Sequence, residues 1–270
     1  MEKKEPYKFT SEDAENYDRY IGPILFEPYG QYMASKVNAT DISSVLEVAC
    51  GSGRLTRHLR KVLPAHVRLF ATDLSADMLH IAQHELNNNG VIFQTEDIQR
   101  LSFPDDSFDL VICQFGMMFL PDKQKGFDEL YRVLRPGGKL MIFTWDDTLN
   151  MPLFKMLIDD LILPHFKDED TTRFKTPFSL HDAKTLGGWM KNSGFKHAES
   201  DKISLPSGNS TAELIVTALF TKHPLGKEIM AKDPEAFEPT ALKFAEKIME
   251  QFGAENTSTP LSALLTTGIK

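Results

Sequence analysis

A short motif in the first third of the chain combines two acids and two glycines at a spacing that suits ligand binding. Glu47 lies four residues before Gly51, Ser52 separates Gly51 from Gly53, and Asp73 follows 20 residues after Gly53. Glycines let the backbone approach a ligand that a Cβ atom would exclude, and N–H groups at a helix N-terminus are free to bind it. A carboxylate about 20 residues further on can accept hydrogen bonds from both hydroxyls of a ribose. Two classes of nucleoside cofactor use this arrangement.

The residue three positions after the second glycine separates these two classes. Dinucleotide sites use G-x-G-x-x-G, in which the third glycine allows close helix–strand packing. Here that position is Thr56. An acid inside the first strand, such as Glu47, gains nothing at a dinucleotide site, whereas it can hold a cationic amino-acid ligand directly or through the loop. A nicotinamide-dependent oxidoreductase is therefore a disfavoured alternative.

The segments around the motif alternate between short apolar runs and amphipathic stretches. This pattern predicts strands at 44–49, 67–73, 91–97, 107–115 and 139–145, with helices at 54–63, after an N-cap at Ser75, and from Asp122 to Leu134, where Arg135-Pro-Gly-Gly138 ends the helix. Repeated strand–helix alternation is typical of a parallel, doubly wound α/β sheet with helices on both faces. Ligands of such sheets bind at the carboxyl ends of the strands.

The regular alternation stops after Trp145. Helices are predicted at 151–163, 182–192, 210–220 and 234–252, and further strands at 197–205 and 261–269. We divide the chain into an N-terminal helical cap (1–40), in which Pro23 and Pro28 should interrupt the helices, a cofactor-binding core (41–146), a lid insertion (147–178), a return to the core sheet (179–206), a helical insertion (207–257) and a last strand (258–270). The insertions are expected to cover the strand ends.

Composition limits the possible functions. With 270 residues, 41% hydrophobic and 25% charged, the chain is neither disordered nor fibrous. The net charge of −8 argues against nucleic acid or an anionic membrane as the main partner. Two cysteines form no disulfide framework, and no stretch approaches the ~18 apolar residues of a membrane span or the core of a signal peptide. We expect a cytoplasmic protein with a small-molecule substrate, and leave its oligomeric state open, with a dimer among the options.

The chain resembles the class I S-adenosylmethionine-dependent methyltransferases in four segments that occur in order: EVACGSGRLT, ATDLSADML, EDIQRLSFPDDSFDLVICQF and ELYRVLRPGGKLMIFTW. It is most similar to the ubiquinone/menaquinone-biosynthesis C-methyltransferase group. The resemblance covers about residues 43–146 and extends weakly to NYDRY (16–20). It implies a Rossmann-like, seven-stranded sheet with an antiparallel last strand, and S-adenosylmethionine as cofactor. Many relatives have Asp where this loop has Glu47, which is a permitted variation.

The resemblance also implies a role for each motif position. Gly51 and Gly53 would lie against the methionine part of the cofactor, with Glu47 holding the loop and the ammonium end. Asp73 would bind the ribose hydroxyls. The remaining positions are Leu74, Met78, Asp97 and Ile98 around the adenine, Gln114 beside the reacting methyl, and Tyr17 or Tyr20 closing over the cofactor.

Methyl transfer from a sulfonium is an in-line displacement, so orientation is the main requirement and can supply up to ~7–11 kcal/mol of the barrier. His165, His181 and His223 lie in or near the predicted insertions and are candidates for a general base, although each is better explained by packing or solvent exposure. We therefore assign no catalytic residue. No His/Cys/Asp cluster has metal-ligand spacing, so no metal is expected.

The acceptor depends on the insertions, which the resemblance does not cover. Apolar residues gather in the lid (Met151, Leu153, Phe154, Met156, Leu157, Phe166, Phe174, Phe178) and after the fourth strand (Phe115, Met117, Met118, Phe119). They predict either a pocket for a small, largely apolar or aromatic acceptor, or simple packing of the lid onto the sheet. A non-catalytic S-adenosylmethionine-binding or partner-binding protein is the alternative function. The sequence leaves the acceptor atom open between carbon, oxygen and nitrogen.

Overall fold

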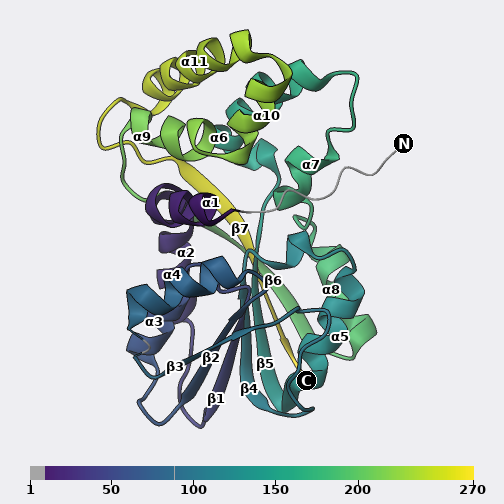
Figure 1. Cartoon of the computed structure of the whole chain (residues 1–270). Coiled ribbons are helices and arrows are strands. Elements are labelled where there is room, and N and C mark those ends of the chain that lie inside the picture. Colours follow the sequence, from purple (N-terminus) through teal and green to yellow (C-terminus); the bar gives the residue numbers. More distant parts are fainter. Residues whose placement is uncertain (1–9, 88) are drawn as a thin grey trace.

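The computed structural model describes residues 10–87 and 89–270 and contains one seven-stranded sheet (Figure 1). The strand order is β3-β2-β1-β4-β5-β7-β6. The strands are β1 (Ser44–Val48), β2 (Arg68–Asp73), β3 (Val91–Thr95), β4 (Phe108–Gln114), β5 (Leu134–Trp145), β6 (Lys196–Pro206) and β7 (Pro260–Ile269). β1 to β5 pair in parallel, whereas β7 runs antiparallel to both β5 and β6. The predicted seven-stranded sheet with an antiparallel last strand is confirmed.

The start of β5 differs from the prediction. The strand begins at Leu134 rather than at Lys139, because Leu134 already pairs with Phe108. The register then shifts, and Lys139 pairs with Leu110. The Arg135-Pro-Gly-Gly138 segment, predicted to end the helix, therefore forms an irregularity within the strand, where Gly137 has a φ of +80°. Glycine tolerates this left-handed conformation without the strain that a Cβ atom would bring.

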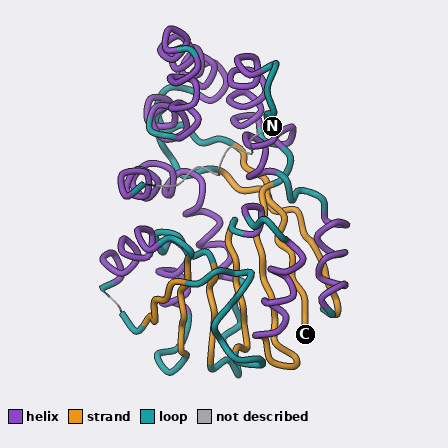
Figure 2. The backbone as a smooth tube through the Cα atoms, turned by 45° about the vertical axis from the view of Figure 1, so that its right-hand side comes forward, coloured by secondary structure: helices purple, strands orange, loops and turns teal. Residues whose placement is uncertain are grey.

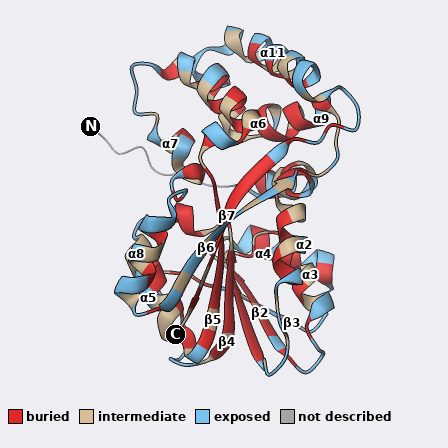
Figure 3. Cartoon of the chain, turned by 180° about the vertical axis from the view of Figure 1, so that it is seen from behind, coloured by how far each residue is buried: buried red, intermediate tan, exposed pale blue. Residues whose placement is uncertain are grey.

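Helices cover both faces of the sheet. α5 (Lys123–Val133) and α8 (Ala183–Ser193) pack together on one side, and α2 (Glu27–Ser35) and α3 (Arg54–Val62) pack together on the other (Figure 3). The N-cap predicted at Ser75 is present, and Asp122, predicted to start a helix, is also an N-cap. The Ser75 hydroxyl caps α4 (Ala76–Leu86) by accepting from the Met78 N–H, and the Asp122 side chain caps α5 by accepting from the Lys125 N–H.

Residues 11–35 form a nearly continuous helix, so the expected interruption at two prolines is wrong. α1 (Ser11–Asn16) leads into the π-helix η1 (Tyr17–Phe26) and then into α2. Pro28 lies in the first turn of α2, and the Ile24 carbonyl, four residues before it, accepts from the Gly208 N–H instead. Pro23 lies inside η1, where its missing N–H would have bonded five residues back, to the Asp18 carbonyl. The Arg54 guanidinium donates to that carbonyl instead.

A layer of helices lies beyond the carboxyl ends of the strands, and the long strands β6 and β7 reach into it (Figure 2). It contains η3 (Thr148–Asn150), α6 (Pro152–Phe154), the π-helix η4 (Lys155–Ile162), η5 (Leu163–Phe166), α7 (Thr172–Lys175), η6 (Thr176–Phe178), α9 (Ala212–Val216), the π-helix η7 (Thr217–Thr221), α10 (Pro224–Lys232) and α11 (Pro234–Phe252). We call segments 147–178 and 207–257 the lid; these domain boundaries stay a prediction. Among residues 10–87 and 89–270, no helix has the length and apolarity needed to cross a membrane.

Candidate functional site

The predicted motif lies at the carboxyl ends of β1 and β4, around a small cavity of about 30 Å³. Tyr17, Phe26, Glu47, Ala49, Cys50, Gly51, Ser52, Arg54, Leu55 and Gln114 line this cavity. The lining therefore joins the glycine loop, the end of β4 and the helix η1. Figure 1 shows η1 and α1 lying over this edge of the sheet, below the lid.

Two acceptor atoms in the cavity wall have no hydrogen-bond partner in the described part of the chain. Among the residues that the structure describes, neither Glu47 Oε2 nor Gln114 Oε1 is paired, although both atoms are buried. Gln114 Nε2 donates to the Phe26 carbonyl at 2.9 Å, which fixes the amide with its oxygen free. Burial raises the pKa of the Glu47 carboxyl to about 8, while the Thr56 hydroxyl opposes this shift and the Asp73 charge adds to it. Unpaired buried acceptors are unfavourable, so this wall fits a cationic, donor-rich group such as an ammonium.

The two glycines of the loop have left-handed backbone conformations for different reasons. Gly51 has a φ of +55°, and a Cβ atom there would meet no atom within 4 Å. Gly53 has a φ of +80°, and a Cβ atom there would lie 2.9 Å from Leu86 Cδ1 and 3.1 Å from Ala82 Cβ. Gly53 therefore allows close packing against α4, whereas Gly51 leaves open space beside the cavity.

This difference predicts opposite phenotypes for two alanine variants. Gly53→Ala should lower the free energy of unfolding by ~2–4 kcal/mol, because left-handed strain and overpacking add. Gly51→Ala should lower it by only ~1–2 kcal/mol, from strain alone, but should weaken binding of S-adenosylhomocysteine at least tenfold. Urea denaturation and calorimetric titration measure the two effects. Equal losses of stability in both variants would contradict the assignment.

Asp73 connects the glycine loop to the loop after β2. Its Oδ2 accepts from the Gly51 N–H at 2.8 Å, and its Oδ1 accepts from the Ser75 N–H at 2.9 Å. Burial raises the pKa of Asp73, although these hydrogen bonds act in the opposite direction. Each oxygen keeps a lone pair for a further donor, so the carboxylate can order the loop and bind hydroxyls at once.

Of the two tyrosines proposed to close over the cofactor, the structure brings Tyr17 into the cavity wall. Its ring stacks on Phe26 with ring centroids 5.1 Å apart. Tyr20 lies outside the lining formed by the described residues, and the Arg19 guanidinium lies 5.3 Å from its ring centroid.

The four positions proposed for the adenine lie after β2 and β3, outside the lining of the cavity as far as the structure describes it. Leu74 is 71% exposed, whereas Met78 and Ile98 are buried. The Asp97 carboxylate accepts from the Gln99 N–H at 2.9 Å. The structure thus gathers the methionine-end positions and leaves the adenine positions along the neighbouring loops. Their cofactor roles stay predictions.

Sequence reasoning missed a pair of charged residues that fastens η1 to the glycine loop. Asp18 Oδ1 accepts from Ser52 Oγ at 2.7 Å and lies 2.9 Å from Arg54 Nη2. Arg54 also pairs with Glu27 at 3.4 Å. A signal was present, because Arg54 occupies the first turn of α3, where the helix dipole disfavours a cation. A cation there needs a specific acidic partner.

The three candidate histidines lie outside the cavity lining in the described chain. The His165 ring lies 3.5 Å from the Thr240 hydroxyl, and His181 Nδ1 lies 2.7 Å from the Phe178 carbonyl. His223 caps α10, and burial lowers its pKa to about 4. In the part of the chain that the structure describes, no group of three or more His, Cys, Asp or Glu residues could hold a metal ion.

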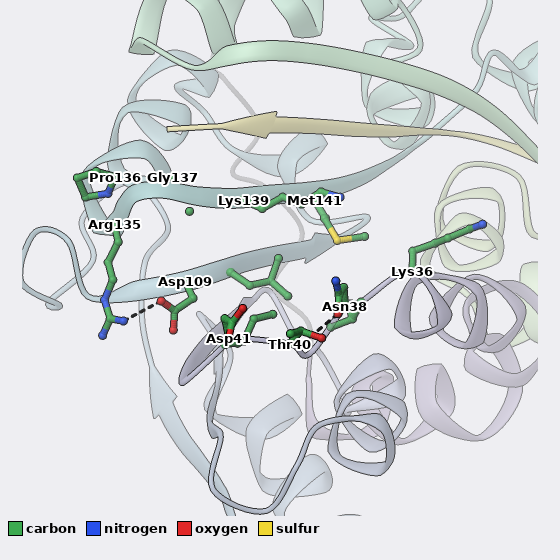
Figure 4. Close-up of a pocket in the computed structure, with 14 residues that line it drawn as sticks. Lys36, Asn38, Thr40, Asp41, Asp109, Arg135, Pro136, Gly137, Lys139 and Met141 are labelled. Atoms are coloured by element: carbon green, nitrogen blue, oxygen red, sulfur yellow. Dashed lines mark hydrogen bonds and ion pairs between the residues drawn. The ribbon is translucent and has the colours of Figure 1, made fainter.

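A larger hollow of about 310 Å³ lies at the amino ends of β4 and β5 (Figure 4). The ion pair between Asp109 and Arg135, at 2.7 Å, lies at one end of it. Ligands of doubly wound sheets bind at the carboxyl ends of the strands, so this hollow lies at the wrong edge for the cofactor. None of the predicted site residues lines it.

Comparison with known proteins establishes the family. Residues 46–142 match the family model described as a methyltransferase domain. Over 169 residues the chain is 31% identical to the ubiquinone/menaquinone biosynthesis C-methyltransferase UbiE of Klebsiella pneumoniae. The aligned region covers 58% of this chain and 67% of that enzyme. The chain belongs to the class I S-adenosylmethionine-dependent methyltransferases. The UbiE enzyme of Escherichia coli is 30% identical over the same length.

Solved structures, among them one of a methyltransferase, share the fold. Phosphoethanolamine N-methyltransferase 2 of Haemonchus contortus, in complex with S-adenosyl-L-methionine, matches with a TM-score of 0.59 and 18% identity. The match covers 97% of this chain and 57% of that one. The YcgJ protein of Bacillus subtilis matches with a TM-score of 0.58 and 18% identity, over 90% and 98% of the two chains.

The cofactor of this methyltransferase is S-adenosylmethionine, which supplies a methyl group activated by a positive sulfur. The observed wall fits its amino-acid end, because two buried acceptors there have no donor among residues 10–87 and 89–270. Glu47 and Gln114 would hold that end, and Asp73 would order the loop. What remains for the chain is to bind, orient and exclude water, as an in-line displacement requires.

Proposed function

We propose that this methyltransferase transfers its methyl group to a small, largely apolar or aromatic molecule. One observation carries the proposal: an aromatic cluster shares a wall with the cofactor cavity. Phe26 lines the cavity, and its ring centroid lies 5.5 Å from that of Phe115 and 5.9 Å from that of Trp145. Phe115 and Trp145 stack on each other at 3.8 Å.

The cluster continues into the lid. Trp145 lies 6.3 Å from Phe154, which lies 5.0 Å from Phe178. Of the apolar residues that the sequence placed in the lid and after the fourth strand, all are buried except Phe119, which is 60% exposed. In this conformation they pack the lid onto the sheet. When an aromatic acceptor binds, contacts between two rings of this cluster would be replaced by similar contacts between those rings and the ring of the acceptor.

Backbone strain at the end of β4 supports the same proposal. Phe115 has a φ of +57° and Ala49, in the cavity wall, has a φ of +52°. A bulky residue in the left-handed region is strained by ~1–3 kcal/mol, and such strain gathers at functional sites. Phe115 directly follows Gln114, and the strained turn between them and the next segment places the Phe115 ring on Trp145.

The net charge of −8 supports a metabolite-sized substrate over a nucleic acid. The cytoplasmic location stays a prediction, and the oligomeric state stays open. The general base is unassigned, because the titratable groups of the described cavity wall belong to the proposed cofactor end.

The two tryptophans of the chain provide a direct test. Trp189 stacks on Phe127 in the α5–α8 pair at 6.1 Å, so Trp189→Phe leaves Trp145 as the single fluorescent reporter of the cluster. With S-adenosylhomocysteine bound, 4-nitrophenol or 1,4-naphthoquinone should quench this variant at saturating concentration, whereas ethanolamine should not. The Trp145→Phe variant reports Trp189 and corrects for absorption by the probes. Radiolabel transfer only to polar acceptors, peptides or RNA would overturn the proposal and leave the methyltransferase assignment standing.

A further inference from the structure

One segment of the chain touches both the cofactor cavity and the lid. We call α1 and η1 together (residues 11–26) the cover segment. Figure 1 shows α1 between the lid helices and the helices of the core. On its core side, the Ser11 hydroxyl donates to Asp77 of α4 at 3.2 Å, and Asp18 binds Ser52 and Arg54 of the glycine loop and α3. Tyr17 and Phe26 of this segment form part of the cavity wall.

On its lid side, the cover segment is held by an ion pair between a buried aspartate, Asp13, and a half-exposed lysine, Lys227. The Asp13 side chain is 1% exposed, and its Oδ1 accepts from Lys227 Nζ of α10 at 2.6 Å. Its Oδ2 accepts from the Thr10 N–H and hydroxyl, at 3.0 and 2.7 Å, which completes the capping box of α1. Replacing Lys227 takes a cation away from a carboxylate in a poorly solvated place, which is unfavourable.

A backbone contact adds to this attachment. The Gly208 N–H, at the point where β6 leads into the lid, donates to the Ile24 carbonyl at 2.8 Å. A Cβ atom at Gly208 would lie 2.1 Å from the Pro23 carbonyl oxygen, so the two chains meet without an intervening side chain. The cover segment is therefore fixed to the lid at both α1 and η1.

The size of the cavity shows why this attachment bears on the cofactor. Sites for drug-sized ligands occupy ~300–1,000 Å³, whereas the cavity under Tyr17 and Phe26 is about 30 Å³. Some part of the cavity wall therefore has to move for the methionine end of the cofactor to enter or leave, and Tyr17 and Phe26 place the cover segment in that wall. Because Asp13 and Lys227 join the cover segment to α10, a movement of this segment either breaks their ion pair or carries the lid with it.

We propose that Lys227, acting through Asp13, is a positioning residue that keeps the cover segment over the bound cofactor, so that release of the nucleoside product is controlled from the lid. This inference rests on the cofactor occupying the described cavity and is independent of the acceptor. It connects the part of the chain that covers the cofactor to the part that would cover the acceptor.

The test compares two lysines of the same helix. Lys227→Met removes the contact to the cover segment. Lys232→Met is the matched control, because Lys232 also lies on α10 but pairs with Glu169 inside the lid. We expect Lys227→Met to speed dissociation of S-adenosylhomocysteine at least tenfold in stopped-flow measurements, and Lys232→Met to change it less than twofold. Lys227→Arg keeps the positive charge and should stay within threefold of the wild type.

A second readout separates positioning from general destabilisation. In Lys227→Met, amide hydrogen exchange should accelerate in residues 11–26 while the strands β1 and β4 keep their protection. Equal dissociation rates for the Lys227→Met and Lys232→Met variants, with unchanged exchange in the cover segment, would overturn the proposal. If instead Glu47→Gln leaves the affinity for S-adenosylhomocysteine unchanged, the cofactor does not occupy the described cavity. The inference is then overturned because its premise is wrong, and not because Lys227 has no effect on the cover segment.

Discussion

Replacing Glu47 by glutamine is expected to weaken S-adenosylmethionine binding by ~2–4 kcal/mol, the scale of a charged hydrogen bond or of one broken buried pair. The side chain is 1% exposed and its Oε2 has no partner among the described residues, so a bound ammonium would be its natural donor. Calorimetric titration of the wild type and Glu47→Gln measures the loss. Unchanged affinity would show that the cofactor does not use this carboxylate.

The same variant should be more stable than the wild type in the absence of cofactor. The folded-state pKa of Glu47 is raised to about 8 from an ordinary value of ~4.3, so between these pH values the folded protein keeps a proton that the unfolded chain has lost. Stability then falls as pH rises through this window, by up to ~1.4 kcal/mol per pH unit. Glutamine lacks this dependence, and the advantage of Glu47→Gln in thermal unfolding should grow from pH 5 to pH 8.

Binding should show the opposite dependence on pH. A cationic ligand favours ionised Glu47, so binding at pH 7 should release close to one proton, and affinity should rise toward pH 8. Titrations in two buffers with different ionisation enthalpies count the proton. Glu47→Gln should release none from this position, which distinguishes Glu47 from other titrating groups.

Replacing Asp73 by alanine is the second change with a large expected effect. It removes the acceptor for the ribose and also both backbone hydrogen bonds that the carboxylate accepts, from Gly51 and Ser75. We expect affinity for S-adenosylmethionine to fall at least 100-fold, ~3 kcal/mol, as for loss of several hydrogen bonds to a charged group. The far-UV spectrum should stay close to that of the wild type, because Asp73 ends a strand whose pairing remains.

Asp97→Ala is the control for this variant. Its carboxylate accepts from Gln99 within its own turn and does not contact the glycine loop. A decrease of less than tenfold is expected, since only a contact to the adenine is at risk. Normal cofactor binding by Asp73→Ala would exclude the ribose role and the role of Asp73 in ordering the loop.

Sequence reasoning succeeded where local pattern and fold agree. Apolar runs such as 44–49 and 107–115 are buried strands because parallel strands have two covered faces. It failed at Pro23, because the propensity rule assumes an α-helix. In the π-helix η1, the Asp18 carbonyl lacks the Pro23 N–H but accepts from the Arg54 guanidinium instead. No local rule could have paired Asp13 with Lys227, since that contact depends on how two distant helices meet.

The position of β7 has a consequence for how the chain reaches its native state. β5 is buried along nearly its whole apolar half, Leu140 to Trp145, and β7 covers its edge from Lys139 to Trp145. Along the chain, β5 and β7 are separated by both lid segments and by α8 and β6. Until β7 docks, β5 presents an open, apolar strand edge, and such edges template pairing between molecules. Closing contacts this distant in sequence are slow to form. Self-association during refolding should therefore begin at this edge, and in the native protein β7 both completes the sheet and protects it from aggregation.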